Sequence, residues 1–327
     1  MAVRDVLVVI SMKKEISVLS VVGPTATYKT RLSIELAKRL NGEIINADSM
    51  QIYKEMKIGT NRPTQVETGE VACHLFGFLS VSEIFSVASY VKIARELIKE
   101  ISNRNKFPIL CGGTGLYIKS LLSDNTFLKD GTNFKIRAKL EDMVKNQGIN
   151  ELFLKLKKID PEASNRIHIN DKKRIIRALE LYYSSGKTLT EQNNLSKNIP
   201  LKYNVRTIGL NYSKRENLYS KINSRVDSMI SRGLVQEVCE VLSMQCSKTA
   251  RSAIGYKEFT DFLKSKCSLD EVIEKVKTKT RRYAKRQLTW FLKDESVFWI
   301  YIDDYKNFNE VILKAESFAK SHFAQNC

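Results

Sequence analysis

The stretch Ile16-Ser-Val-Leu-Ser-Val-Val-Gly23-Pro-Thr-Ala-Thr-Tyr-Lys29-Thr30 decides the fold of this 327-residue chain. Its start is mostly apolar and predicts a buried strand, and leucines recur at helical spacing from Leu32 to Leu40. Between them lie a glycine, a lysine and a threonine, spaced as in loops whose backbone N–H groups bind phosphate oxygens at a helix N-terminus. The stretch therefore predicts a strand, a phosphate-binding loop and a helix.

One position of this loop departs from the usual pattern. Tyr28 stands where a glycine normally precedes the lysine, and a bulky residue is unfavourable there if the backbone needs a positive φ. Lys29 is still expected to meet the phosphates and Thr30 to bind Mg²⁺. The alternative is an ordinary strand-to-helix turn. It is disfavoured because Gly23, Lys29 and Thr30 all occupy the expected positions.

Strand and helix patterns alternate in the first part of the chain. Glu43–Ala47 and Phe107–Cys111 predict two more strands, and Val87–Ile101 predicts an amphipathic helix between them. Such alternation implies a parallel sheet with right-handed crossovers. We therefore expect an α/β fold.

The pattern changes from about residue 125 to residue 198, where no strand stands out and helical patterns follow one another. We expect a helical insertion at 125–198 in a catalytic core that consists of residues 16–124 and 199–327. The later elements are predicted as helices at Phe134–Val144, Glu151–Lys157, Asp171–Tyr183, Glu216–Met244 and Leu269–Phe291, strands at Val205–Leu210 and Val297–Ile302, and a C-terminal helix.

The chain is strongly basic, with 54 Lys and Arg residues against 36 Asp and Glu residues and a net charge of +18. Such a charge attracts polyanions, and nucleic acid is the first candidate. A lysine-rich surface without a polyanionic partner is an equally good interpretation of the total charge. The distribution of the charge has to decide between the two.

Cysteines and apolar stretches indicate the compartment. The six cysteines form no CxxC pair and have no metal-binding spacing with the three histidines. Reduced thiols in a cytoplasmic protein fit this pattern best. No apolar stretch approaches the length of a membrane span, so no membrane association is expected. Residues 1–11 precede Met12 and the first predicted element, and are either an extension or the result of a misplaced start.

Two further motifs follow predicted strands, Asp48-Ser-Met-Gln51 after the second and Cys111-Gly-Gly-Thr-Gly115 after the third. Parallel strands end at one edge of the sheet, and ligands bind there. Asp48 is therefore expected near the phosphates, where a carboxylate can accept a proton or hold the water of a metal. Taken alone, a helix cap without chemistry is the simpler interpretation of Asp48. Thr114 is expected to donate to the same ligand.

A basic helix is predicted near the C-terminus. The window from Lys275 to Arg286 contains seven basic residues and no acid. Its basic stripe lies opposite an apolar face predicted to pack in the core; the stripe consists of Lys275, Lys279, Arg282 and Arg286, and the face of Val276, Tyr283 and Leu288. A merely solvated helix usually alternates its charges, so this helix favours a nucleic-acid interface. A second basic patch lies at Asp171–Arg177.

Seven motifs, in order, strongly resemble the tRNA dimethylallyltransferase family, and the last is close to diagnostic. The resemblance spans about residues 18 to 292, and the absence of a C-terminal Cys/His metal motif makes it closer to bacterial members. The motifs are Gly23-Pro-Thr-Ala, Asp48-Ser-Met-Gln-Ile-Tyr, Ile58-Gly-Thr, Gly112-Gly-Thr-Gly-Leu-Tyr, Asp171 with Arg174 and Arg177-Ala-Leu-Glu, Ile254-Gly-Tyr-Lys-Glu, and Ala284-Lys-Arg-Gln-Leu-Thr-Trp290.

The resemblance implies a P-loop NTPase-like parallel sheet flanked by helices, with an inserted all-helical subdomain that binds tRNA. It also implies transfer of a dimethylallyl group from dimethylallyl diphosphate to N6 of the adenosine 3′ of the anticodon, in tRNAs that read codons beginning with U. The loop, although such loops are commonly described as ATP-binding, would hold the prenyl donor with Mg²⁺. The expected partner is the anticodon stem-loop, and the expected oligomeric state is a monomer.

Site residues follow from the same resemblance. Asp48 is the expected base for the N6 proton, and Arg225 is expected to support donor binding or the transition state. The donor diphosphate is expected to contact the loop residues Gly23, Pro24, Thr25, Ala26, Thr27, Tyr28, Lys29 and Thr30. Contacts with tRNA are implied for Asp48, Ser49, Met50, Gln51, Thr114, Arg137, Lys173, Arg174, Ile175, Ile176, Arg177, Ser252, Ala253, Ile254, Gly255, Tyr256, Lys257, Lys285, Arg286, Gln287, Leu288, Thr289, Trp290 and Phe291.

Three other functions stay open at this point. A small-molecule kinase also uses a phosphate loop, but has no need of the basic helix. A transferase that prenylates free adenine nucleotide would not need the helical insertion. An RNA-binding protein without catalysis is suggested by Tyr28 and disfavoured by the presence of Asp48, Lys29 and Thr30. Finally, Cys73-His74 stands where the family usually has two histidines, and a structural role for His74 is preferred to metal binding.

Overall fold

The computed structural model describes residues 15–123, 133–197 and 202–323. Contacts divide the chain into two compact units. The core unit is Met1–Lys119 with Tyr203–Cys327, and the insertion unit is Ser120–Lys202. The predicted insertion at 125–198 falls within the second unit. Its predicted ends, and the choice between Met1 and Met12 as the start, lie outside the described residues.

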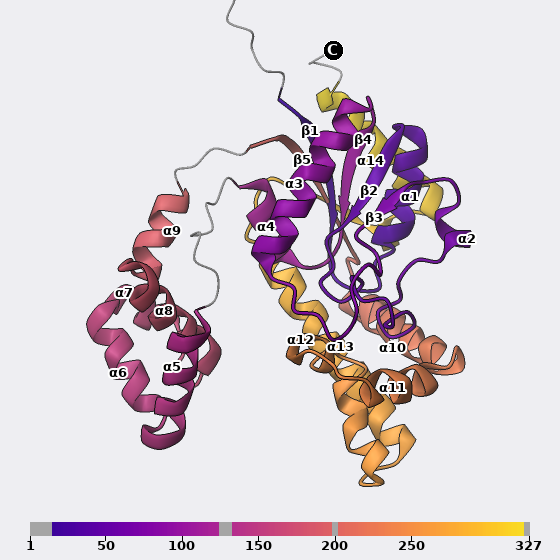
Figure 1. The fold of residues 1–327 in the computed structure, drawn as a ribbon. Helices are drawn as coiled ribbons and strands as arrows, with labels where there is room; N and C mark the ends of the chain where they lie inside the picture. The colour runs from indigo at the N-terminus through magenta and orange to yellow at the C-terminus, as the bar shows by residue number, and fades with distance from the viewer. Residues whose placement is uncertain (1–14, 124–132, 198–201, 324–327) are drawn as a thin grey trace, which may run out of the picture. The chain divides into compact units, whose positions relative to one another are not determined.

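The core unit contains a six-stranded parallel sheet with strand order β3-β2-β4-β1-β5-β6 (Figure 1). The strands are β1 (Ser17–Val22), β2 (Gly42–Asn46), β3 (Cys73–His74), β4 (Phe107–Cys111), β5 (Asn204–Asn211) and β6 (Val297–Tyr301). The helices are α1 (Lys29–Arg39), α2 (Gln65–Thr68), α3 (Val87–Asn103), α4 (Gly115–Leu122), which reaches into the insertion unit, α10 (Arg215–Ser231), α11 (Leu234–Ser243), α12 (Lys248–Arg251), α13 (Leu269–Phe291) and α14 (Phe308–Phe323), with short 3₁₀ helices at Lys257–Thr260, Phe262–Lys264 and Ile302–Asp304.

Helices cover both faces of the sheet. The leucines and isoleucine of α1 pack with α14 against one face and form an apolar core with β1, β4 and β5. Figure 1 shows α3 on the opposite face, where its buried stripe from Tyr90 to Ile101 faces the sheet. Burial on both sides explains why the central strands are almost continuously apolar. The predicted α/β fold with a parallel sheet is confirmed.

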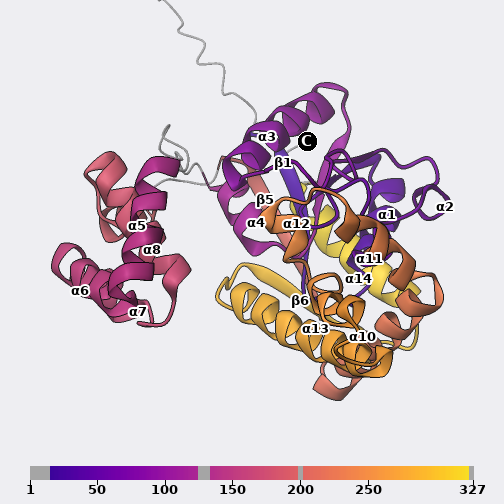
Figure 2. The ribbon, with the colours of Figure 1, turned by 60° about the horizontal axis from the view of Figure 1, so that its bottom comes forward.

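A second apolar core lies beyond the carboxyl ends of the strands. It joins the segment Ile52–Met56, which follows β2, to α10, α11 and α13 and to the turn around Tyr256. Figure 2 shows α10 and α13 running side by side in this part of the molecule, as their contacts require. The site is therefore built between the sheet edge and this helical layer.

The insertion unit has a hydrophobic core of its own. Its described regular elements after α4 are all helices: α5 (Phe134–Gln147), α6 (Ile149–Ile159), α7 (Pro161–Arg166), α8 (Lys172–Ser185) and α9 (Leu189–Lys197). Leu152, Leu156, Ile175 and Leu179 are almost fully buried among them. Asp160 accepts from Ala163 N at 3.0 Å and from Thr190 N at 2.9 Å, and so links the starts of α7 and α9.

One expectation about the elements was wrong, and one strand was missed. The single helix predicted at Glu216–Met244 is two helices, because Gly233 adopts φ 95° and begins α11. The short strand β3 was missed, since two residues carry no periodicity. Across the described ranges, no helix has both the length and the apolar character needed to span a membrane.

Candidate active site

Three strands end side by side at the site. Val21 of β1 and Asn46 of β2 both lie in register with Cys111 of β4. Backbone hydrogen bonds continue this alignment beyond the strands, from Ala47 N to Cys111 O at 2.8 Å and from Thr114 N to Ala47 O at 3.1 Å. The register therefore brings the phosphate loop, Asp48 and the glycine-rich turn to one edge, as the sequence predicted.

The phosphate loop contains the strained position expected at Tyr28. Tyr28 has φ 56° and ψ 24°, the left-handed region that favours glycine. Its ring packs edge-on against Phe308 of α14, with ring centroids 5.6 Å apart, and Arg31 lies 4.4 Å over the same Phe308 ring. An aromatic contact of this kind offsets part of the backbone cost.

Gln287 of α13 joins the phosphate loop to the glycine-rich turn. Its Oε1 accepts from Thr25 N at 2.9 Å, and its Nε2 donates to Gly113 O at 2.9 Å. A Cβ on Gly113 would lie 2.0 Å from that amide nitrogen, so a larger residue would displace the Gln287 amide and break this link. The glycine at position 113 of the motif is therefore explained by its packing against Gln287 of α13.

Two cavities meet at this edge, and they share Thr25, Asp48, Arg225 and Tyr283. The first, which we call the phosphate cavity, has a volume of about 410 Å³ and is lined by the loop from Thr25 to Arg31 and by polar residues of α10. The second, which we call the apolar cavity, has a volume of about 300 Å³. Its apolar lining consists of Met50, Val226, Met229, Leu234, Ala253, Ile254 and Val276.

Basic groups are concentrated in the phosphate cavity. Burial lowers the pKa of Lys29 to about 8, and Arg225 adds to this effect while Asp48 opposes it. Burial also lowers the pKa of Arg225, to about 10, against the attraction of Asp48. Both groups are cationic at neutral pH and pay a desolvation cost that an anion would relieve. Lys29 Nζ donates to Pro24 O at 2.5 Å, and Arg225 Nη2 donates to Thr60 O at 3.3 Å.

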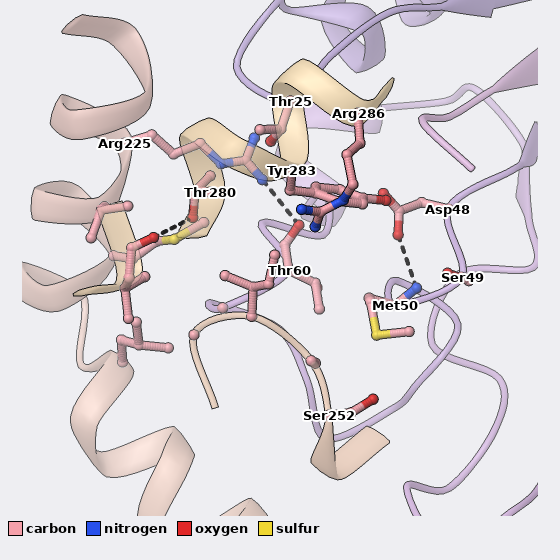
Figure 3. Close-up of a pocket in the computed structure, with 18 residues that line it drawn as sticks. Thr25, Asp48, Ser49, Met50, Thr60, Arg225, Ser252, Thr280, Tyr283 and Arg286 are labelled. Atoms are coloured by element: carbon pink, nitrogen blue, oxygen red, sulfur yellow. Dashed lines mark hydrogen bonds between the residues drawn. The ribbon is translucent and has the colours of Figure 1, made fainter. Parts of the chain in front are cut away.

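Asp48 lies at the boundary of the two cavities, because it lines both. Its Oδ1 accepts from Met50 N at 2.9 Å (Figure 3), and its backbone N donates to Asn46 Oδ1 at 2.9 Å. These local bonds fix the turn after β2 and leave Oδ2 without a hydrogen-bond donor among the described residues. The carboxylate can therefore accept a proton from a group placed in the apolar cavity.

Tyr283, predicted to pack in the core, lines the site instead. Tyr283 is only half-buried, and its side chain lines both cavities. Burial, followed by the charge of Asp48, raises its pKa, and the nearby hydroxyl of Thr114 opposes this shift. Arg286 lies 5.6 Å over its ring. Helical periodicity correctly placed Tyr283 on the inward face of α13. At this turn of the helix, however, the inward face lines the cavities and is not packed in the core.

Glu237 of α11 forms hydrogen bonds with two of the sequence motifs, and the sequence did not predict this role. Its carboxylate accepts from three successive backbone N–H groups, those of Lys57, Ile58 and Gly59, at 2.7 to 3.0 Å. It also accepts from Tyr256 Oη at 2.6 Å. Glu237 therefore ties the Ile58-Gly-Thr motif to the Ile254-Gly-Tyr motif, both of which line the apolar cavity. Nothing in the sequence distinguishes this glutamate from other glutamates of amphipathic helices, so the role could not be predicted.

The basic stripe of α13 faces outward. Lys275, Lys279, Arg282 and Arg286 are exposed, as are Lys285, Thr289 and Trp290. By contrast, Lys277 is largely buried and forms an ion pair with Asp227 at 2.9 Å, and Arg281 donates to Asn223 Oδ1 at 2.6 Å. Within the described ranges, Lys279, Arg282 and Lys285 form no ion pair. A row of unpaired cations on one helix face can bind a polyanion.

Several residues predicted to contact tRNA have buried side chains, although Ala253 lines the apolar cavity and Gln51 and Gln287 line the phosphate cavity. Gln51 donates to the backbone oxygens of Thr60 and Asn61. Leu288 is half-buried on the inner side of α13. The buried members are Gln51, Ile175, Ile176, Ala253, Tyr256, Gln287 and Phe291. The exposed or half-exposed members are Asp48, Ser49, Met50, Thr114, Arg137, Lys173, Arg174, Arg177, Ser252, Ile254, Lys257, Lys285, Arg286, Thr289 and Trp290, while Gly255 is buried but lines the apolar cavity.

In the insertion unit, the predicted contacts Arg137 and Arg177 surround Glu180. Glu180 is 1% exposed, and its Oε2 lies 3.3 Å from Arg177 Nη1 and 3.7 Å from Arg137 Nη1. A buried carboxylate between two half-exposed or exposed arginines holds both guanidinium groups near one place on the surface. Lys173 and Arg174 are exposed on the same helix, α8.

His74 has a structural environment. Its Nε2 lies 2.7 Å from Glu43 Oε2, and Arg104 Nη2 lies at the same distance from that oxygen. Among the described residues, no group of three or more His, Cys, Asp and Glu side chains is placed to hold a metal ion. Thr30, which lines the phosphate cavity, still fits Mg²⁺, because this ion commonly takes one or two protein oxygens and completes its shell with phosphates and water.

The fold and the site define a class of α/β enzyme with two adjoining cavities. A loop at a helix N-terminus and basic side chains line the first cavity, the second cavity is apolar, and a carboxylate lies between them. The IPP transferase family model matches residues 51–294. A tRNA dimethylallyltransferase of Caldanaerobacter subterraneus is 45% identical over 300 residues, covering 90% of this chain and 95% of that protein. The chain belongs to the IPP transferase family, whose curated members found here are tRNA dimethylallyltransferases.

Solved structures agree with this assignment. The tRNA isopentenylpyrophosphate transferase of Bacillus halodurans has a TM-score of 0.71 and 39% identity, covering 95% of this chain and 98% of that one. A eukaryotic dimethylallyltransferase described as acting on tRNA has a TM-score of 0.79 and 30% identity, covering 94% of this chain and 80% of that one. The likeness therefore extends over both units of the chain.

Proposed function

We propose that this protein transfers a dimethylallyl group from dimethylallyl diphosphate to tRNA, and that the acceptor is N6 of the adenosine 3′ of the anticodon in tRNAs that read codons beginning with U. One observation carries the proposal: a cationic cavity and an apolar cavity meet at Asp48. A diphosphate fits the first and a prenyl group with a flipped adenine fits the second. The bond that breaks then lies beside the carboxylate.

The residues account for each part of the reaction. N6 of adenine is a poor nucleophile because its lone pair is delocalised into the ring, so its proton has to leave as the new bond forms. In the proposal, N6 attacks C1 of the donor, the C1–O bond breaks, Asp48 takes the N6 proton and diphosphate leaves. Lys29, Arg225 and the loop N–H groups offset the charge that develops on the leaving oxygen.

A Mg²⁺ ion held by Thr30 would supply further charge to the diphosphate. The adenine has to leave the anticodon stack to reach the apolar cavity. The basic stripe of α13, whose residue Arg286 lines that cavity, is the proposed contact for the anticodon stem-loop. We further propose that the enzyme acts as a cytoplasmic monomer.

The test is an incubation of the purified protein with labelled dimethylallyl diphosphate and Mg²⁺, with unmodified tRNA in one reaction and AMP in another. We expect label in tRNA alone, at the adenosine 3′ of the anticodon. Label in AMP and not in tRNA would contradict the proposal and identify a free-nucleotide transferase. Transfer of the γ-phosphate of ATP to a small molecule, with no use of the prenyl donor, would identify a kinase.

A further inference from the structure

Helix α10 presents one polar face to the phosphate cavity. Lys221, Ser224, Arg225 and Ser228 all line it, at the spacing that puts side chains on one side of a helix. Arg225 also lines the apolar cavity, whereas Lys221 lines the phosphate cavity alone. The face therefore runs away from the boundary at Asp48 as it passes from Arg225 to Lys221.

Lys221 is an available cation. The charged residues that line the phosphate cavity are four basic ones, Lys29, Arg31, Lys221 and Arg225, and two acidic ones, Asp48 and Glu67. Glu67 already accepts from Thr64 N and Thr64 Oγ1 in the cap of α2. Lys221 is exposed, and its side-chain amine forms no ion pair or hydrogen bond with any group of the described ranges. The cavity thus has an excess of positive charge and a free ammonium in its lining.

We propose that Lys221 binds the terminal phosphate of the donor, while Arg225 meets the phosphate that is linked to the reacting carbon. This assignment rests on the proposed function, because that function places the C1–O bond at the boundary between the cavities. Residues four apart on a helix have Cβ atoms about 5–6 Å apart. Two cations at that spacing match two linked phosphates that extend from the boundary toward solvent.

The assignment predicts a difference between two ligands. Pyrophosphate has the equivalent of the terminal phosphate, and dimethylallyl monophosphate lacks it. Lys221→Met should weaken pyrophosphate binding about tenfold, the typical value of a charge-assisted hydrogen bond. It should leave the affinity for dimethylallyl monophosphate within about twofold. Arg225→Met should weaken the binding of both ligands.

Isothermal titration calorimetry of the full chain with Mg²⁺ and without tRNA measures both affinities without turnover. Lys221→Arg should restore pyrophosphate binding, because it keeps the charge. Lys214→Met is the matched control, since Lys214 precedes α10, is exposed and does not line the cavity.

Unchanged pyrophosphate affinity in Lys221→Met, or an equal loss for both ligands, would overturn the assignment. If wild-type protein fails to prenylate tRNA but the calorimetric difference holds, the proposed function is wrong and Lys221 remains a diphosphate ligand. If prenylation succeeds and the difference is absent, the function stands and the role of Lys221 falls.

Discussion

Asp48 is the residue on which the proposed chemistry depends. Its Oδ1 accepts from Met50 N, so Asp48→Asn keeps this contact and removes only the ability to accept a proton. We expect kcat to fall by about 10² to 10⁴, the usual contribution of a general base, while the Kd for tRNA stays within about threefold. Single-turnover prenylation and filter binding measure the two quantities.

The exposed Asp270→Asn, at the start of α13, is the control for the removal of one carboxylate and should change neither quantity. If Asp48→Asn reduced binding and rate equally, Asp48 would be a tRNA contact and not the base.

Lys29 makes donor binding depend on pH. Its pKa is lowered to about 8, so the free enzyme has a protonated amine below this pH and loses the charge above it. Only the protonated amine attracts a phosphate, and pyrophosphate affinity should therefore be highest below pH 8 and decline as the pH rises through that value. Calorimetric titrations between pH 7 and pH 9 test this. Lys29→Arg keeps its charge over the whole range and should remove the decline; a decline that persists in this variant would assign it to another group.

Tyr28 and Phe308 should be energetically coupled. Tyr28 has the left-handed backbone that glycine prefers, and its ring contacts Phe308. In a double-mutant cycle, Phe308→Leu should cost about 0.5–1.5 kcal/mol more in the presence of Tyr28 than in Tyr28→Gly. Urea unfolding gives the four free energies. Additive effects would show that the aromatic contact does not offset the strain in the loop.

Among the elements, α13 has three roles on three faces. Val272, Val276 and Phe291 pack in the core, Tyr283 and Gln287 build the site, and the basic stripe faces outward. The same helix therefore links the phosphate loop to the proposed tRNA surface. A substitution on one face of α13 need not disturb the other two. The proposed tRNA surface can therefore be changed without changing the cavities or the core.

Replacing Lys279 and Arg282 by Ala should weaken tRNA binding and reduce the salt dependence of its affinity. Each phosphate that the protein no longer neutralises lowers the slope of log K against log salt by about 0.7 to 0.9. Binding measured from low to moderate salt gives the slope. Lys92 and Lys99, two exposed lysines of α3, provide a control pair of equal charge. A slope unchanged by the α13 substitutions would exclude this stripe as a tRNA-binding surface.

For the whole molecule, the two units predict a separation of binding functions. Both cavities are lined by residues of the core unit, whereas the insertion unit has its own apolar core and its own cluster of arginines. The ends of the insertion lie together, because Lys202 N donates to Leu122 O at 3.3 Å. A short linker can therefore replace it.

Deleting the residues between Leu122 and Lys202 should keep pyrophosphate binding within about threefold and reduce tRNA affinity at least about tenfold, because the deletion removes several cations that can neutralise phosphates. Calorimetry and filter binding measure these affinities, and circular dichroism checks that the core remains folded. Arg137→Ala combined with Arg177→Ala in the full chain should weaken tRNA binding in the same direction. Full tRNA affinity after the deletion would assign recognition to the core unit alone.

Much of the fold follows from local patterns. Apolar runs, leucine spacing and glycine turns predict β1, β2, β4, the helix after β1 and the helix before β4, because periodicity and turn chemistry act over a few residues. The parallel sheet then requires the loop, Asp48 and the glycine-rich turn to meet at one edge. For this reason the position of Asp48 was predictable before any contact was known.

The sequence by itself thus determined the alternation of strands and helices in the core, the phosphate loop and the sheet edge that carries the site. Only the tertiary structure decided that Gln287 joins Thr25 to Gly113, that Glu237 holds the backbone of Lys57–Gly59, and that Tyr283 stands between two cavities. These partners lie far apart along the chain and follow no periodic pattern. Their pairing depends on how whole helices pack, and packing is set by the combined burial of many side chains.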